Sequence, residues 1–296
     1  MKRHLATALV GYGSGFHFSS DPPRDVADVR YLRGSDPYDT IACVLANLHQ
    51  GTFEATEALL PLLKASDEHF VWSAATDLLA YGAPQDLVRR FFAWAYECPE
   101  DSRRCAACSV ALMAGNSWAI EPALDLLPTI ADLQMRTFLR ADLSWLLEAS
   151  PGPLSIEPSD IESPNQAGVL PWQDPRGVPD EAEYATGVRR AVDQNSAALA
   201  AAGDAAFAEG EPMDVSNIAQ RLLERLEEPR TFSPRLHHAA LQLEASTGLR
   251  AWECFAGSGQ VDRARLAAII LRFLDSDAPA RFAPGTRYFF GHRIPG

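Results

Sequence analysis

The sequence lacks long hydrophobic runs. None of its stretches approaches the roughly 20 consecutive apolar residues that a membrane-spanning helix needs. The chain begins with basic residues and a short apolar segment at residues 5–10, but residues 11–18 offer no typical cleavage site for a signal peptidase. We therefore expect a cytoplasmic protein that does not bind a membrane.

The sequence also lacks the motifs of common catalytic sites. It contains no His-x-x-x-His, no His-Glu-x-x-His and no Gly-x-Ser-x-Gly. The glycines at residues 11–15 are spaced as Gly-x-Gly-x-Gly, which differs from the dinucleotide-binding fingerprint, and no helical pattern follows them. Carboxylates are abundant, yet the periodicity places no pair of them on an apolar helix face. The sequence therefore predicts no catalytic residue and no cofactor.

Potential metal ligands are few and dispersed. The adjacent His237 and His238 would point about 100° apart on a helix, so they cannot readily share one metal ion. Among the five cysteines, Cys105 and Cys108 form a Cys-x-x-Cys with Cys98 nearby, but zinc needs about four ligands and no second pair completes the set. We expect no metal site. We expect Cys105 and Cys108 to be buried packing residues with free thiols, as a reducing compartment favours.

Basic residues are in the minority. The chain has 39 acidic and 26 basic side chains, and its formal net charge is -13. A field of this sign repels the phosphate backbone of nucleic acids and favours basic partners, or it serves only solubility. With 47% hydrophobic residues, the chain has enough apolar surface for a substantial core.

A repeated helical pattern is the clearest feature that the sequence does contain. Four stretches about 33 residues apart can be aligned so that small or apolar residues coincide, at residues 37–48, 67–81, 100–114 and 132–147. The aligned positions are Ile41, Ala74, Ala107 and Arg140 in one column, and Leu45, Leu78, Ala111 and Ser144 in the other. The fourth stretch departs from the pattern in both columns. This period predicts a stack of helix pairs, each packed against its neighbours.

Residues 55–83 resemble a HEAT-type repeat. A helix containing Leu59 and Leu63 is followed by a short acidic turn and then by a helix with paired alanines at Ala74 and Ala75. The next copy has Arg103–Ala107, and the following one has Asp132 and Arg136, at positions where such repeats often carry these residue types. The resemblance covers about residues 37–149 and implies a helical solenoid.

The predicted fold is all-α, with an irregular start and a non-helical end. We divide the chain into an irregular segment with a possible strand, HEAT-like repeats, an acidic proline-rich loop, helices that continue the solenoid, and a basic aromatic tail. These parts correspond to residues 1–36, 37–149, 150–179, 180–280 and 281–296. Helix is expected, with interruptions, from residue 180 to Ala208, and again at 215–226, 234–245 and 262–275.

Two segments contain candidate residues for binding a partner. The acidic loop carries Asp160, Glu162 and Asp174, although its composition is more typical of a solvated linker. The tail places aromatic residues between arginines, and aromatics and arginine dominate binding hot spots. Alternatively, the tail folds back as a strand or hook and caps the repeat array. The candidates in the tail are Arg287, Tyr288, Phe290 and His292.

These features favour a non-catalytic, protein-binding solenoid. In its acidity, its predicted helical fold and its lack of a catalytic motif, the chain is similar to some families of bacterial immunity proteins, which are acidic, cytosolic antitoxins. That similarity implies that it neutralises a basic toxin domain by direct binding. The alternatives are a HEAT-like enzyme, a nucleic-acid-processing protein or a general scaffold. A nucleic-acid-processing protein would need a basic groove, which the surplus of acidic residues disfavours.

Overall fold

The computed structural model describes residues 15–18, 21–22, 24–33, 36–149, 154, 181–227, 234–255 and 261–296. Within these residues the protein is mainly α, with 12 α-helices packed against one another and two small two-stranded sheets. The possible strand at residues 5–10 and the loop candidates Asp160, Glu162 and Asp174 lie outside the described residues. In the part of the chain that is described, no helix is both long and apolar enough to cross a membrane.

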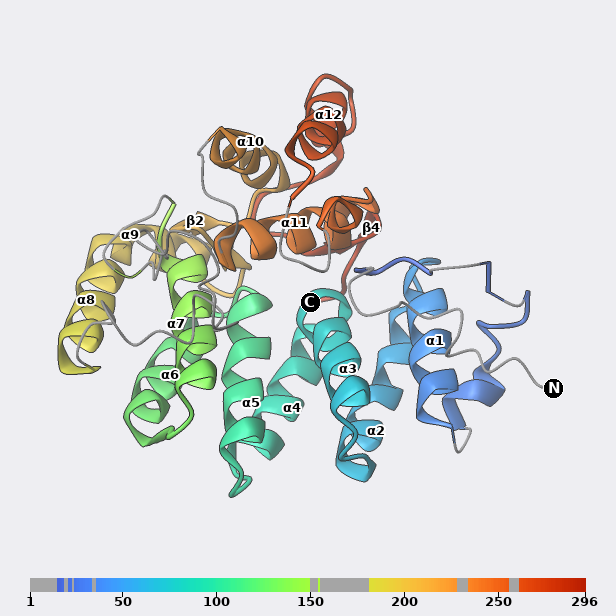
Figure 1. Cartoon of the computed structure of the whole chain (residues 1–296), viewed down its shortest axis with the longest axis horizontal. Helices are drawn as coiled ribbons and strands as arrows, with labels where there is room; N and C mark the ends of the chain where they lie inside the picture. Colours follow the sequence, from blue (N-terminus) through green and yellow to red (C-terminus); the bar gives the residue numbers. More distant parts are fainter. Residues whose placement is uncertain are drawn as a thin grey trace, which may run out of the picture.

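The four stretches with the repeated pattern form a row of helices. These are α1 (Pro37–Leu48), α3 (His69–Gly82), α5 (Asp101–Met113) and α7 (Leu133–Leu147), which lie side by side in chain order (Figure 1). Aspartates start two of them, because Asp36 accepts a hydrogen bond from the Tyr38 backbone and Asp132 accepts one from the Met135 backbone. We call these four helices the helix row. Their predicted positions are confirmed.

Three further helices connect the members of the helix row. They are α2 (Leu59–Ala65), which follows a 3-10 helix at Phe53–Ala58, α4 (Gln85–Tyr96) and α6 (Ile120–Leu126), and each packs against the row. The expected packing role of Cys105 and Cys108 is confirmed, because both are buried against neighbouring helices. Burial raises the pKa of Cys105 to about 12, so its thiol stays protonated.

Arg140 occupies a position at which the other three helices of the row have a small or apolar residue. Its side chain is accommodated because it has partners on the next helix. In α8 (Glu181–Gln194), Glu181 pairs with the Arg140 guanidinium at 2.8 Å, and the Tyr184 ring lies 4.6 Å from it. The Tyr184 hydroxyl also donates to the Arg140 carbonyl at 2.9 Å. A buried arginine with these contacts joins α7 to α8, where a small residue would leave the space between them empty.

After α9 (Ser196–Ala202), the chain forms a hairpin where the sequence predicted helix. Strands β1 (Phe207–Ala208) and β2 (Glu211–Pro212) are joined by Glu209 and Gly210, both with positive φ. A two-residue turn of this kind matches the twist of paired strands. The turn donates its two backbone N–H groups to Trp145 and Leu146, carbonyls that the end of α7 leaves unpaired. The predicted helix up to Ala208 is therefore wrong in its last residues.

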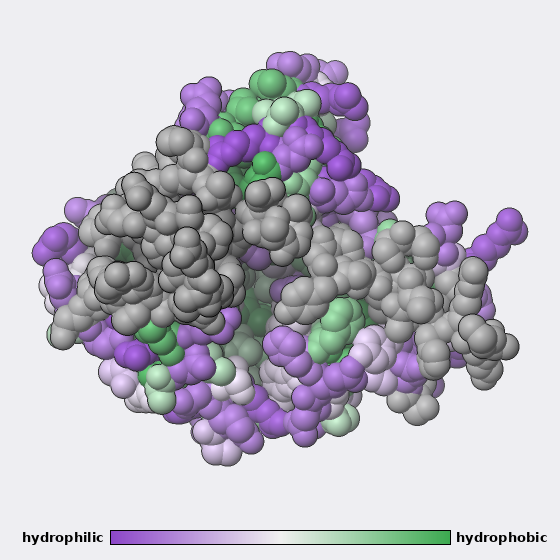
Figure 2. Space-filling view, in the orientation of Figure 1, coloured by the Kyte–Doolittle hydropathy of each residue, from purple (hydrophilic) through white to green (hydrophobic). Residues whose placement is uncertain are grey.

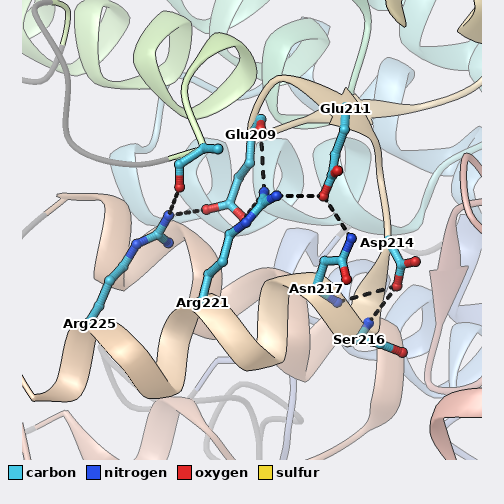
Figure 3. A network of polar contacts seen from close by, with 8 residues as sticks. Glu209, Glu211, Asp214, Ser216, Asn217, Arg221 and Arg225 are labelled. Carbon is cyan, nitrogen blue, oxygen red and sulfur yellow. Dashed lines mark hydrogen bonds and ion pairs between the residues drawn. The ribbon is translucent and has the colours of Figure 1, made fainter.

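Glu209 is the centre of a buried polar network (Figure 3). Its carboxylate is 1% exposed and pairs with Arg221 at 3.2 Å and with Arg225, both from α10 (Val215–Leu226). Arg225 also donates to the Ala149 carbonyl, and Arg221 pairs with Glu211 at 2.8 Å. These contacts fix the hairpin, the end of α7 and α10 to one another.

The remaining helices lie across one end of the helix row. In Figure 1, α11 (Pro234–Thr247) runs crosswise over the row and contacts α3 and α7, with α10 and α12 (Arg263–Leu274) above it. The predicted helices in this part of the chain are confirmed. Their place across the row, which the 33-residue pattern does not indicate, encloses a cavity between α11 and the row.

The end of the chain folds back as a second hairpin. Strands β3 (Tyr288–Phe289) and β4 (His292–Arg293) are joined by Phe290 and Gly291, whose N–H groups donate to the Ala245 and Ser246 carbonyls at the end of α11. Phe290 also has positive φ, as Glu209 does in the first hairpin. The prediction of a non-helical tail that folds back is confirmed from Phe282 onward. The tail covers the ends of α3 and α11.

Candidate functional site

The cavity between the helix row and α11 has a volume of about 580 Å³. Each neighbouring helix presents one stripe of side chains to it, at the spacing of three and four residues that aligns one helix face. On α3 the stripe contains Phe70, Ser73, Ala74, Asp77, Leu78 and Tyr81. Figure 2 shows a hollow with hydrophobic surface near the centre of this face, below α11. Most of the wall is apolar, with a few polar groups among it.

Asp77 is the polar group most open to the cavity. Its side chain is exposed, although it lies deep among protein atoms, and this desolvation raises the pKa of its carboxyl to about 7. Among the described residues, Asp77 has neither a hydrogen bond nor an ion pair. The helix row thus places a carboxyl in the cavity wall without giving it a counter-charge.

Asp142 lines the same cavity from α7. Its side chain is buried, and desolvation raises the pKa of its carboxyl to about 7, against the opposing effect of a hydrogen bond from Ser109 on α5. The His238 Nε2 atom of α11 lies 3.5 Å from the carboxyl. Asp142 therefore differs from Asp77 in having two polar neighbours.

Tyr81 and His237 are neutral groups in the cavity wall. Burial and the negative charges of Asp77 and Asp142 raise the pKa of Tyr81 well above its ordinary value, so its hydroxyl remains a hydrogen-bond donor. Within the described ranges, the Tyr81 hydroxyl has no hydrogen-bond partner, although the residue is only 4% exposed. Burial lowers the pKa of His237 to about 4, and its ring stacks on Trp252 with 4.2 Å between ring centres.

Glu244 on α11 holds one side of the cavity in place. It is fully buried, and its carboxyl accepts hydrogen bonds from the backbone N–H groups of Phe16 at 2.7 Å and Trp252 at 2.8 Å. Phe16 and Trp252 both line the cavity, and the Phe16 ring lies 5.2 Å from that of Tyr81. Because these groups are far apart in the sequence, only the folded chain brings them together.

Asp77 and Asp142 line one cavity from two different helices, α3 and α7, so a search for two carboxylates on one helix face does not find them. The 33-residue sequence pattern contains a signal that could have identified Asp142. Residues Thr76, Ser109 and Asp142 are 33 residues apart, and all three line the cavity at equivalent positions of α3, α5 and α7. The alignment of small residues passes over this polar column, and Asp77 stands next to it.

The structure places the tail candidates mostly inside the fold. The Arg287 guanidinium donates to the Ala80 and Ala83 carbonyls at 2.6 and 2.8 Å, and burial lowers its pKa to about 10. Tyr288 is buried, Phe290 is half-buried, and His292 is exposed. Arg287 and Tyr288 thus hold the tail against the ends of the helices. Their binding of a partner, like that of Phe290 and His292, stays a prediction, and none of the four lines the cavity.

Among the residues that the structure describes, no three His, Cys, Asp or Glu side chains are grouped so that they could hold a metal ion. We compared the chain with protein-family models, curated proteins and solved structures, and none of them matches it.

Proposed function

We propose that this protein binds a small organic molecule in the cavity beneath α11. The observation that carries the proposal is a space of about 580 Å³ with largely apolar walls, into which Asp77 and Tyr81 present polar groups that have no partner among the described residues. Binding sites for small molecules have volumes of roughly 300–1,000 Å³ and combine apolar walls with a few placed polar groups. The cavity has this size and composition.

The polar groups argue against a mere packing defect. Empty cavities in proteins are apolar, whereas buried polar groups are almost always paired with protein, water or a ligand. A carboxyl with a raised pKa in a partly enclosed space is typical of functional sites. Asp77 and Asp142 both fit that description.

We also propose that the helix row is a HEAT-like solenoid and that the cavity occupies its inner face. The order of α1, α3, α5 and α7, the connecting helices between them and the 33-residue spacing of Thr76, Ser109 and Asp142 support this interpretation. Solenoids present extended inner surfaces for binding. Here α11 crosses over that surface and narrows it to a small-molecule site.

The test is a screen of neutral and charged aromatic fragments, including tryptophol, by ligand-observed NMR. The variant Ala74→Phe would fill part of the cavity from α3, and we expect it to abolish the binding seen with the wild type. The matched control is Ala200→Phe, at an exposed position of α9 outside the cavity, which should bind as the wild type does. The urea midpoint of each variant shows that it is folded. Fragments that bind both variants equally, or no binding at all, would overturn the proposal.

A second candidate is the binding of a basic protein domain, as the sequence predicts for an immunity protein. The observation that favours it is the net charge of -13, which would attract such a domain. The test is co-purification with the products of neighbouring genes, using Ala74→Phe as a parallel bait. Recovery of a basic toxin-like domain by both forms would support this candidate separately from the cavity. Tight DNA binding at physiological salt would exclude it.

A further inference from the structure

We infer that the ligand of this cavity carries a positively charged nitrogen, which Asp77 binds next to an aromatic wall. This inference rests on the proposed function, because it names the chemical class of the molecule that the cavity takes. The sign of the lining residues is its first support. Among the residues that the structure describes, they include two acids, Asp77 and Asp142, and no lysine or arginine.

The histidines of the wall do not supply the missing positive charge to Asp77. His237 is neutral near pH 7, because burial lowers its pKa to about 4. His238 lies beside Asp142, at 3.5 Å from that carboxyl. In a partly desolvated space the attraction between opposite charges is several times stronger than in bulk water. A ligand cation is therefore the group that best satisfies Asp77.

The aromatic lining suits the same ligand. Trp252, Phe70 and Phe138 line the cavity from three different parts of the chain, and the Phe138 side chain is 45% exposed. Aromatic faces attract cations that have been partly removed from water. An aromatic or aliphatic body attached to the nitrogen would also cover Phe138. The ligand class is thus an organic ammonium ion with an apolar body.

Binding of a cation would change the protonation of the cavity. The titratable groups that face Asp77 are Tyr81 on its own helix, Asp142 on α7, and His237 and His238 on α11. With a pKa of about 7, the Asp77 carboxyl is partly protonated at neutral pH, and a bound cation favours its ionised form. Binding at pH 7 should therefore release up to about half a proton per carboxyl that the cation contacts.

Three probes with one indole ring and different charges test the inference: tryptamine, tryptophol and indole-3-acetate. By calorimetry at pH 7, we expect tryptamine to bind at least about tenfold more tightly than tryptophol, as one charge-assisted hydrogen bond would give. Indole-3-acetate should bind least. Repeating the tryptamine titration in buffers with different ionisation enthalpies measures the proton release.

Asp77→Asn keeps the shape of the side chain and removes its charge. We expect it to weaken tryptamine binding about tenfold, to reduce the proton release, and to leave tryptophol binding unchanged. The matched control is Asp204→Asn, whose side chain is fully exposed, and it should bind all three probes as the wild type does. If tryptophol binds as well as tryptamine, or indole-3-acetate binds best, the inference fails while the proposed function stands. If no probe and no fragment binds, both fail.

Discussion

Desolvated acidic side chains occur in two regions of this protein, and their surroundings differ. At the first hairpin, Glu209 is 1% exposed and pairs with two arginines of α10. In the cavity, Asp77 and Asp142 lie among apolar side chains, and no arginine or lysine of the described part of the chain lines the space. The first carboxylate is paired with fixed cations, whereas burial raises the pKa of the other two to about 7.

The comparison indicates that the charge of Glu209 stabilises the fold, whereas the carboxyls of Asp77 and Asp142 are available for binding. A buried ion pair is retained when the desolvated charges satisfy each other, as Glu209 and Arg225 do between the hairpin and α10. Among the described residues, no lysine or arginine lines the cavity, so its carboxyls can be neutralised by a proton or by a molecule that enters. The two regions should therefore respond in opposite ways to removal of the acidic charge.

Glu209→Gln should have the largest effect on stability. It removes the counter-charge of Arg225, whose side chain is only 9% exposed, and leaves a buried cation unpaired. We expect a loss of about 3 kcal/mol in the free energy of unfolding, measured by urea denaturation. The control is Glu57→Gln, because Glu57 also makes two hydrogen bonds to one arginine, Arg90, but both side chains are about half exposed. That variant should lose less than about 1 kcal/mol. Equal losses in the two variants would contradict the comparison.

Asp142→Asn should increase the free energy of unfolding relative to the wild type, and only at high pH. In the folded protein the pKa of Asp142 is about 7, against 3.8 for the ordinary carboxyl. Between these two values the folded state keeps a proton that the unfolded state has released, so the contribution of this group to stability falls as the pH rises and is fully lost above about pH 7. Asparagine removes this dependence.

We compare the free energy of unfolding of Asp142→Asn with that of the wild type at each pH. The difference should shift in favour of the variant by about 2 kcal/mol from pH 5 to pH 8, measured from urea midpoints. Effects of the substitution that do not depend on pH cancel in this difference. Asp204→Asn, at a fully exposed side chain, should differ from the wild type equally at both pH values. A gain at pH 5 as large as at pH 8 would show that Asp142 is not protonated in the folded state.

Local patterns in the sequence were sufficient to predict the helices of both regions. Helix α7 follows from an N-capping aspartate and a periodic apolar stripe, and α10 from its strongly one-sided pattern. The hairpin that carries Glu209 could not be predicted in this way, because its strands have two residues each and follow an alanine-rich helix. Its turn is stabilised by the distant carbonyls of Trp145 and Leu146.

The cavity was harder to predict than the helices around it. The helices of its side walls follow from the 33-residue sequence pattern, and the polar column of Thr76, Ser109 and Asp142 could have been read from the sequence. Its cover could not, because α11 lies outside the residues with that pattern and contacts α3, α7 and the tail. Whether a carboxyl on an inner helix face meets solvent or a closed space depends on that cover.

The smallest expected effect comes from placing a cation in the cavity, whose described lining contains no lysine or arginine. Ser73 lines the cavity on α3, four residues before Asp77, so Ser73→Lys places an ammonium group on the same face of the helix. We expect the pKa of Asp77 to fall slightly from about 7, followed by the carboxyl ¹³C shift in an NMR titration. Stability should increase by about 0.5 kcal/mol at pH 8, where the carboxyl is ionised in both proteins, and by less at pH 5. Ser73→Gln, which is long and polar but uncharged, should change neither quantity. The comparison with Glu209 assumes that the pKa of Asp77 is raised because no cation lies beside it. An unchanged titration of Asp77 in Ser73→Lys would contradict this assumption.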